Sequence, residues 1–348
     1  MKTVKIQTHA NISLNKYWGK RDEKLFLPTK SSLTISLSEL KTTTLIQQLE
    51  CEYLGQKNQD SIFINGIAAT DVHRQKIVDF LNFFRQKYDI KKYFKISTIN
   101  NFPTAAGLAS SSSGFAALAL GIDKVCDLNL NKKELSILAR HGSGSACRSI
   151  EGGFMLWYKG VKLDGNDSYA EQIFDNSHWP ELCILVVIVK NQTKFIGSRE
   201  GMKMTVATSQ YYNTWLEKSA QRLPNLINAI AKKDFTTVGQ LAQDDWQDMQ
   251  KTMLDTKPQL NYWTDESYKV MSTINALCNQ GIECYFTTEA GPNLKVLCLE
   301  NDQNKIKSEL ENILGIIQII PCKVASDPKI EILNSQIIQR RENEALSI

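Results

Sequence analysis

Asn100-Asn101-Phe102-Pro103-Thr104-Ala105-Ala106-Gly107-Leu108-Ala109-Ser110-Ser111-Ser112-Ser113-Gly114 is the stretch around which the rest of this sequence is interpreted. Its glycines permit a tight turn and its serines supply hydroxyl and N–H donors, immediately before apolar residues at helical spacing. Loop N–H groups and the positive end of that helix would converge on one anion. The stretch therefore predicts a phosphate-binding loop, although without the Gly-Lys-Ser/Thr of the common nucleotide loop, and the alternative is a serine-rich helix cap.

The composition is that of a globular protein with two domains. The chain has 348 residues, 42% hydrophobic and 22% charged, and this length exceeds that at which single cores stop growing. We expect domains at residues 1–180 and 181–348, because a buried strand pattern begins after Trp179-Pro180. The net charge of +4 is too small to indicate a nucleic-acid partner, but it is compatible with basic clusters around a polyanionic small molecule.

The N-terminal residues and the cysteines indicate the compartment. The first residues lack the apolar core of a signal peptide, and no later stretch is long and apolar enough to span a bilayer. The eight cysteines are scattered without Cys-x-x-Cys spacing, which favours reduced core residues over a disulfide framework or a zinc site. We therefore expect a cytoplasmic protein without a membrane partner.

Strand and helix patterns follow one another along the chain. Helical patterns over residues 211–256 are interrupted at Pro224, and Ser198 is the expected N-cap of a further helix. The charged residues 330–348 predict a surface helix or a frayed tail. The remaining periodicity predicts strands over 4–12, 27–37, 94–99 and 183–189, a strand meander over 42–67 with a hairpin turn at Asn65-Gly66, helices over 71–88, 132–140 and 267–278, and a hairpin over 284–299.

Three further segments carry polar residues suited to phosphate chemistry. Residues 11–22 place two lysines and a tyrosine around a glycine, although composition alone favours a solvated turn. Residues 142–153 alternate Gly and Ser before Arg148, which predicts a second anion-binding concavity, with a plain linker as the alternative. Glu289 lies in the turn of the last hairpin, where a carboxylate is ordinarily only solvated.

In this order, these segments resemble the motifs of the diphosphomevalonate decarboxylase family, a branch of the GHMP kinase superfamily. The resemblance runs from about residue 4 to residue 324, and its segments read Asn-Ile-x-x-x-Lys-Tyr-Trp-Gly-Lys-Arg, Pro-x-x-x-Gly-Leu-x-Ser-Ser, Gly-Ser-Gly-Ser-Ala-x-Arg-Ser, Ser-Arg-x-Gly-Met and Ala-Gly-Pro-Asn. It implies an α+β protein with the two-domain GHMP kinase fold. The active-site cleft would lie between an N-terminal mixed α/β domain with the ATP phosphate loop and a C-terminal ferredoxin-like α/β sandwich with the catalytic carboxylate turn.

The resemblance also implies roles for individual residues. By this match Glu289 is the catalytic carboxylate, Ser111 the essential loop serine, and Arg148 the clamp of the substrate carboxylate. Lys16 is implied as the fourth catalytic residue. The other implied residues are Tyr17, Lys20, Ser143, Ser145, Ser198 and Arg199 for the substrate, and Gly107, Ser110, Ser111 and Ser112 for the ATP phosphates. No residue is implied as a metal ligand, because magnesium would come with ATP.

The function that the resemblance implies is the ATP-dependent decarboxylation of mevalonate 5-diphosphate to isopentenyl diphosphate, through phosphorylation of the 3-hydroxyl. This reaction belongs to the mevalonate pathway of isoprenoid biosynthesis. ATP and Mg²⁺ are the implied cofactors, and mevalonate 5-diphosphate is the small-molecule partner. A homodimer is the implied assembly, although the sequence itself does not define the oligomeric state.

Three positions depart from the family pattern. Lys30 stands where the family usually has asparagine, and we expect it to add a charge near the site entrance. Gln250 ends a segment that reads differently in bacterial relatives, and Glu289 replaces the family's aspartate. These departures leave open a sibling activity, as a mevalonate-phosphate decarboxylase or a mevalonate 3-kinase. A non-catalytic ligand-binding protein on the same fold is the other alternative, against which Ser111 and Arg148 argue.

Overall fold

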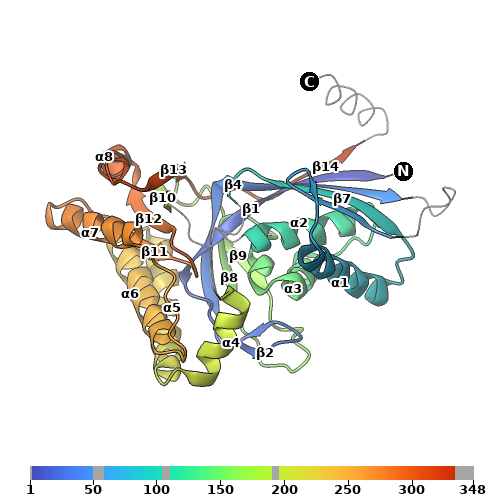
Figure 1. Cartoon of the computed structure of the whole chain (residues 1–348), viewed down its shortest axis with the longest axis horizontal. Coiled ribbons are helices and arrows are strands. Elements are labelled where there is room, and N and C mark those ends of the chain that lie inside the picture. The colour runs from blue at the N-terminus through green and yellow to red at the C-terminus, as the bar shows by residue number, and fades with distance from the viewer. Residues whose placement is uncertain (1, 50–58, 104–109, 190–195, 334–348) are drawn as a thin grey trace.

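The computed structural model of this chain describes residues 2–49, 59–103, 110–189 and 196–333. They form two units of sheet and helices that lie side by side (Figure 1). Gly107, which we expect to bind ATP phosphates, lies outside the described residues. Among the helices of the described part, none has the length and apolar character needed to cross a membrane.

The larger sheet has 8 strands in the order β14-β1-β4-β7-β5-β6, with β8 beside β4 and β9 beside β8. Its pairs are antiparallel except for β5 and β7, which run parallel on either side of helix α1 in the sequence. Helices α1, α2 and α3 cover one face (Figure 1). The bounds are β1 (Thr3–Asn15), β4 (Ser32–Leu49), β5 (Ser61–Ile64), β6 (Ile67–Ala68), β7 (Tyr93–Asn100), β8 (Phe154–Trp157), β9 (Ala170–Phe174), β14 (Lys329–Leu333), α1 (Asp71–Tyr88), α2 (Ser110–Val125) and α3 (Lys132–Gly142).

Helix α2 lies directly on this sheet because one of its central residues has no side chain. A Cβ atom on Gly121 would lie 2.5 Å from Cδ1 of Ile46 in β4 and 2.7 Å from Cδ1 of Ile6 in β1. A larger residue here would therefore require the Ile46 and Ile6 side chains to move. This close contact fixes where the first turn of α2, with its serines, stands relative to the strands.

The smaller sheet has 4 antiparallel strands in the order β11-β12-β10-β13. Its central strand β10 is buried along its whole length, as the run of apolar residues predicts. The bounds are β10 (Leu182–Val189), β11 (Tyr285–Thr288), β12 (Leu294–Leu299), β13 (Ile316–Cys322), α5 (Tyr212–Lys232), α6 (Phe235–Leu254), α7 (Asp265–Asn279) and α8 (Glu300–Glu311).

The two units share one hydrophobic core. On one face of β10, Ile184 and Val186 pack in the same buried cluster as Ile12 of β1 and Ile35 of β4. On its other face, Leu185 and its neighbours pack with residues of α7 and α8. Because burial of apolar surface is the main stabilising term in folding, this shared cluster holds the end of β1 against the second unit.

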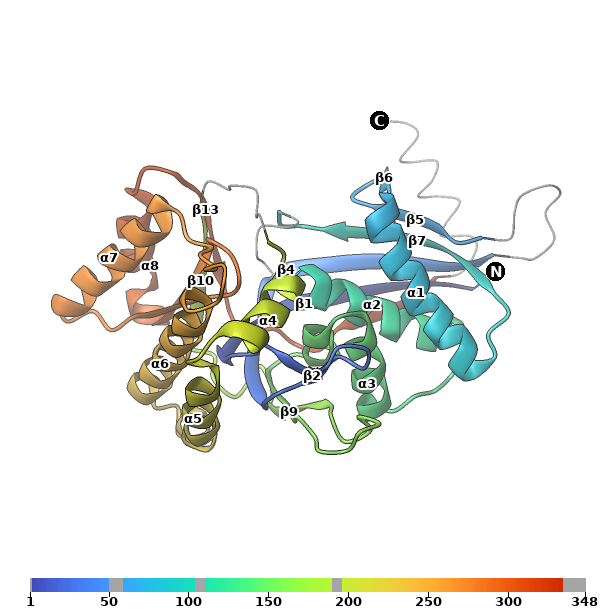
Figure 2. The ribbon, with the colours of Figure 1, turned by 60° about the horizontal axis from the view of Figure 1, so that its bottom comes forward.

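Short elements stand where the two units meet. Helix α4 (Ser198–Thr208) contacts both the small strand β2 (Lys20–Asp22) and helix α6, and Figure 2 shows it between them. Strand β2 pairs with β3 (Leu27–Pro28), and the 3-10 helix η1 (Gly144–Ser149) follows α3. These segments carry most of the polar motifs of the sequence.

Local signals account for several boundaries. Asn65 and Gly66 both have positive φ, 52° and 79°, which confirms the hairpin turn that the Asn-Gly pair predicts between β5 and β6. Asn131 and Glu134 form a capping box at the start of α3. The hairpin around Glu289 is confirmed as the β11–β12 pair.

Three expectations from the sequence are wrong. Helix α5 continues through Pro224, because buried Trp215 before it and Leu226 and Ile230 after it hold both halves in the core. The N-cap of α4 is Gly197, and Ser198 is already the first helical residue. A strand, β14, stands at residues 329–333, where the sequence predicted the start of a surface helix or frayed tail, because the edge of β1 offers backbone hydrogen bonds there. The rest of that expectation, residues 334–348, lies outside the described residues.

Candidate active site

A cleft of about 440 Å³ lies where the two units meet. Its walls come from β1, α1, β7, α2, η1, α4 and the β11–β12 turn. The structure brings to it ten of the side chains singled out in the sequence, namely Tyr17, Lys20, Ser110, Ser111, Ser143, Ser145, Arg148, Ser198, Arg199 and Glu289. Lys16 is buried just outside the lining, and Ser112 is buried in α2 and does not line the cleft.

Glu289 reaches from the β11–β12 turn to the end of β1. Its Oε1 accepts the N–H of Ser13 at 2.9 Å and lies 3.4 Å from Nζ of Lys16. Burial by itself would raise the pKa of this carboxyl group, but the Lys16 ammonium, the Ser13 N–H, Lys295 and Arg148 together hold the pKa below its ordinary value. Glu289 therefore faces the cleft as an ionised hydrogen-bond acceptor.

Lys16 is fully buried behind Glu289. Its Nζ donates to the carbonyl of Thr288 at 2.8 Å, and its backbone N–H donates to Oδ2 of Asp245 in α6 at 2.6 Å. Burial lowers the pKa of Lys16, while the charges of Glu289 and Asp245 oppose that shift. The ammonium is thus an internal counter-charge for the carboxylate of Glu289.

Arg148 stands in η1 with its guanidinium against two aromatic rings. Its CZ atom lies 5.6 Å from the ring centroid of Tyr17 and 5.5 Å from that of Trp157, and an Nη donates to Oγ of Ser32 at 2.8 Å. Arg148 is 2% exposed, and its Nε has no hydrogen-bond partner among the described residues. Arg148 lines the cleft, and a buried cation with an unused donor is suited to an anionic ligand.

The serines of the two Gly/Ser segments meet in the cleft. Oγ of Ser111, in the first turn of α2, lies 3.3 Å from Oγ of Ser143, which lies 3.3 Å from Oγ of Ser145. Tyr17 leaves no room for a side chain opposite, because a Cβ on Gly144 would lie 2.6 Å from its hydroxyl oxygen. The two anion-binding segments predicted from the sequence are therefore parts of one site.

Lys20 and Arg199 flank one aromatic ring at the rim. Nζ of Lys20 lies 5.0 Å and CZ of Arg199 lies 4.8 Å from the ring centroid of Phe26. Lys20 also pairs with Glu23 at 2.6 Å, and Arg199 donates weakly to the carbonyl of Gly142 at 3.5 Å. Two cations from different units thus converge where a diphosphate could be neutralised.

The other end of the cleft is apolar and was not identified from the sequence. It lies between α1, β7 and α2. Its lining combines the apolar residues Ile64, Ile77, Ile96, Phe115 and Leu118 with the polar residues His73, Lys76, Thr98 and Asn100. A lining of this mixed composition is suited to an aromatic ring that carries polar groups.

Helix α6 supports the site, although we assigned no function to its sequence. Asp245 binds the Lys16 amide, and both Trp246 and Gln250 donate to Oγ1 of Thr288, at 2.8 and 3.3 Å. Thr288 directly precedes Glu289, so α6 positions both partners of the ion pair. The only signal in the sequence was an aspartate on the apolar face of a helix.

From the sequence we expected Lys30 near the site entrance, and this expectation is wrong. Lys30 is 5% exposed and absent from the lining of the cleft, because the turn before β4 folds its side chain beneath the end of β1. Its Nζ donates to Oδ1 of Asn15 at 2.8 Å and to the carbonyl of Lys16 at 2.5 Å.

Comparison with known proteins matches both halves of the chain. A family model described as the diphosphomevalonate decarboxylase-like N-terminal domain matches residues 8–170, and one described as the mevalonate 5-diphosphate decarboxylase C-terminal domain matches residues 184–346. The diphosphomevalonate decarboxylase of Aspergillus fumigatus is 37% identical over 323 residues, which are 88% of this chain and 79% of that protein.

Solved structures agree over nearly the whole length. Mevalonate diphosphate decarboxylase from Staphylococcus aureus superposes with a TM-score of 0.88 and 36% identity, over 96% of this chain and 98% of that one. A structure described as MDDEF in complex with MVAPP, AMPPCP and magnesium gives a TM-score of 0.87 and 38% identity, over 96% and 99% of the two chains. The two-domain GHMP kinase fold expected from the sequence is thereby confirmed.

Proposed function

This chain belongs to the diphosphomevalonate decarboxylase family, and from that premise we propose that it converts mevalonate 5-diphosphate to isopentenyl diphosphate with ATP. The γ-phosphoryl group passes to the tertiary 3-hydroxyl. The C3–O bond then breaks with loss of phosphate, and the electron pair of the broken bond to the carboxylate becomes the new double bond as carbon dioxide leaves. ADP, phosphate, carbon dioxide and isopentenyl diphosphate balance the two substrates.

The observation that carries this proposal is the ionised Glu289 in one cleft with the Ser111 hydroxyl and the Arg148 guanidinium. Glu289 orients the 3-hydroxyl and accepts its proton, with Lys16 as counter-charge. Arg148 holds the substrate carboxylate with its guanidinium, because this residue lines the cleft. Each role places charge where the reaction needs it, at a site closed off by buried side chains.

The remaining polar groups divide between the two polyanions. Ser111 and Ser110 stand at the positive end of α2 and bind the ATP phosphates, while the apolar pocket between α1 and β7 takes the base. Ser143, Ser145, Tyr17, Lys20, Ser198 and Arg199 face the diphosphate of the second substrate. Magnesium neutralises the phosphates with which it arrives, and no group of three or more His, Cys, Asp or Glu side chains in the described part of the chain is arranged to bind it by itself.

A single assay tests this function against its siblings. Purified protein with ATP and Mg²⁺ is given mevalonate, mevalonate 5-phosphate or mevalonate 5-diphosphate, and ADP and carbon dioxide are measured separately. We expect both products in equal amounts with the diphosphate only. ADP without carbon dioxide would indicate a 3-kinase, preference for the monophosphate would indicate the sibling decarboxylase, and binding without either product would indicate a ligand-binding protein.

Arg148→Lys will lower kcat/KM for mevalonate 5-diphosphate by about 30- to 100-fold, or roughly 2 to 3 kcal/mol. Lysine keeps the positive charge but loses the planar fork, the hydrogen bond to Ser32 and the stacking on Tyr17 and Trp157. Steady-state kinetics at low and saturating substrate check the expectation. Wild-type kinetics in both regimes would remove Arg148 from the carboxylate site.

The same proposal includes a homodimeric assembly and a cytoplasmic location. The seven cysteines in the described part of the chain are free thiols, which fits a reducing compartment, and ATP is the phosphoryl donor of the cytoplasm. Family membership supports a homodimer, and light scattering of the purified protein tests it.

A further inference from the structure

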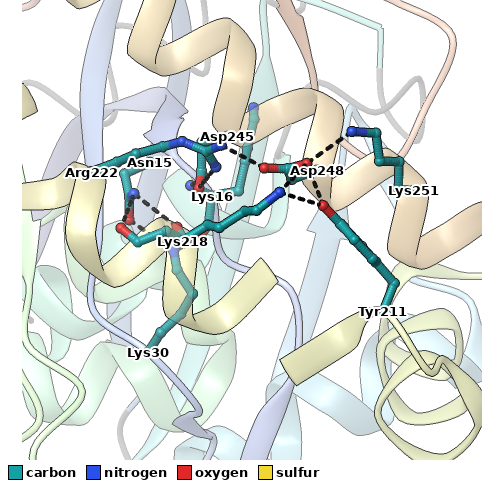
Figure 3. A network of polar contacts seen from close by, with 10 residues as sticks. Asn15, Lys16, Lys30, Tyr211, Lys218, Arg222, Asp245, Asp248 and Lys251 are labelled. Atoms are coloured by element: carbon teal, nitrogen blue, oxygen red, sulfur yellow. Dashed lines mark hydrogen bonds and ion pairs between the residues drawn. The ribbon is translucent and has the colours of Figure 1, made fainter. Parts of the chain in front are cut away.

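Figure 3 shows a network of polar contacts around Asn15, Lys16 and Asp245, and Lys30 lies at one end of it. Lys30 reaches beneath the end of β1, where its Nζ donates to Oδ1 of Asn15 at 2.8 Å and to the Lys16 carbonyl at 2.5 Å. The same Nζ lies 5.1 Å from the ring centroid of Trp215 in α5. Lys30 therefore binds the residue that carries the counter-charge of Glu289, but through its backbone.

The second unit holds the opposite side of the same segment. The N–H of Lys16 donates to Oδ2 of Asp245 at 2.6 Å, and Oδ1 of Asp245 lies 3.7 Å from an Nη of Arg222 in α5. Nδ2 of Asn15 donates to the carbonyl and Oγ of Ser219, at 3.1 and 2.9 Å. The N–H of Lys16 is thus fixed by α6 and its carbonyl by Lys30.

Burying a lysine is costly unless its charge and donors are used. An apolar side chain of the same length would still fill the space against Trp215. It would, however, leave Oδ1 of Asn15 and the carbonyl of Lys16 without these hydrogen bonds. The hydrogen bonds to Asn15 and to the Lys16 carbonyl therefore explain why a lysine is buried at position 30.

We propose that Lys30 is a positioning residue for the reaction: it holds the Asn15–Lys16 backbone against α5 and α6, so that the Lys16 ammonium stays on Glu289. The inference rests on the proposed function, because it gives Lys30 its role through the ion pair of Lys16 and Glu289. Lys30 itself does not line the cleft and touches no substrate.

The charges around Lys30 make its role visible in a pH profile. Facing it are Asp245 from α6, Lys16 directly after β1, Arg148 from η1 and Arg222 from α5, the last also paired with Asp248. Burial lowers the pKa of Lys30 to about 8, Asp245 opposes this, and the three cations lower it further.

The contact with Glu289 raises the pKa of Lys16 against the effect of burial, so a Lys16 ammonium that is no longer held on Glu289 has a lower pKa. Lys16 must be protonated to balance Glu289. Activity is therefore lost as pH rises through the pKa of Lys16, and without Lys30 that loss must occur at lower pH.

The test is Lys30→Met in the full-length chain, because methionine keeps the length of the stem and removes the charge and the donors. We expect kcat with mevalonate 5-diphosphate to fall by about 10- to 100-fold, with both KM values changed less than about threefold. The alkaline limb of the kcat/KM profile should move downward by about one pH unit. Lys30→Gln keeps an amide donor group, so it should lose less kcat and show a smaller shift in the same direction.

Lys323→Met is the matched control, since Nζ of Lys323 also donates to a backbone carbonyl, that of Pro180 at 2.8 Å, but outside the cleft. It should leave kcat and the alkaline limb unchanged. A Lys30→Met or Lys30→Gln protein with lowered thermal stability but wild-type kcat and an unmoved limb would overturn the inference alone. Wild-type protein that releases neither ADP nor carbon dioxide would instead overturn the proposed function, and this inference with it.

Discussion

Glu289→Gln will reduce the release of both ADP and carbon dioxide from mevalonate 5-diphosphate by about 10⁴-fold, the upper end of what a general base contributes. Glutamine keeps the length of the side chain and can still accept the Ser13 N–H. It cannot accept a proton, and it leaves the buried Lys16 ammonium without its carboxylate partner. Because phosphoryl transfer comes first, ADP and carbon dioxide should fall together. Single-turnover measurements of both products check this.

The affinity of the Glu289→Gln variant for its substrate shows whether the variant has lost catalysis or its structure. The substrate diphosphate is assigned to Ser143, Ser145 and the cations of the rim, so its affinity in Glu289→Gln should stay within about threefold of the wild type. Glu283→Gln is the matched control, because this glutamate precedes β11 in the same hairpin and bonds to Thr236 and Tyr285 outside the cleft. Release of both products at the wild-type rate by Glu289→Gln would make the carboxylate a bystander and favour a sibling activity.

The sequence predicts those parts of the site that are short motifs of consecutive residues. The serines of the first turn of α2 and the turn that carries Glu289 are marked by local signals, glycines and a change of hydrophobic period, which act within a few residues. Their meeting in one cleft was implied by the family resemblance and could not be derived from periodicity, because Ser13 and Glu289 are 276 residues apart.

No local sequence pattern indicates the contacts that support the Lys16–Glu289 ion pair. Asp245 binds the backbone N–H of Lys16 from 229 residues away, and Lys30 binds its carbonyl from 14 residues away. In the sequence both look simply like polar residues of a helix or turn. Burial of a charge becomes visible only once the fold supplies its partners. Pro224 fails as a helix breaker for the related reason that packing on both of its sides outweighs local propensity.

Ser111→Ala should lower kcat by about 10²- to 10³-fold, or roughly 3 to 4 kcal/mol, the scale of losing one preorganised donor to a transferring group. The Ser111 hydroxyl stands in the first turn of α2, exposed to the cleft and 3.3 Å from Oγ of Ser143. Its loss removes a donor aimed at the ATP phosphates but leaves the helix end, whose N–H groups and dipole persist. KM for ATP should therefore rise far less than kcat falls.

Ser113→Ala separates this role from helix capping. Ser113 is fully buried two residues further along α2, where its Oγ bonds to Oγ1 of Thr42 at 2.6 Å and to the carbonyl of Ser110 at 3.4 Å. That variant should lose thermal stability and keep kcat, whereas Ser111→Ala should keep the melting temperature and lose kcat, since its side chain makes no buried contact. If Ser111→Ala instead behaves like Ser113→Ala, the hydroxyl caps the helix, and phosphate binding falls to the backbone N–H groups alone.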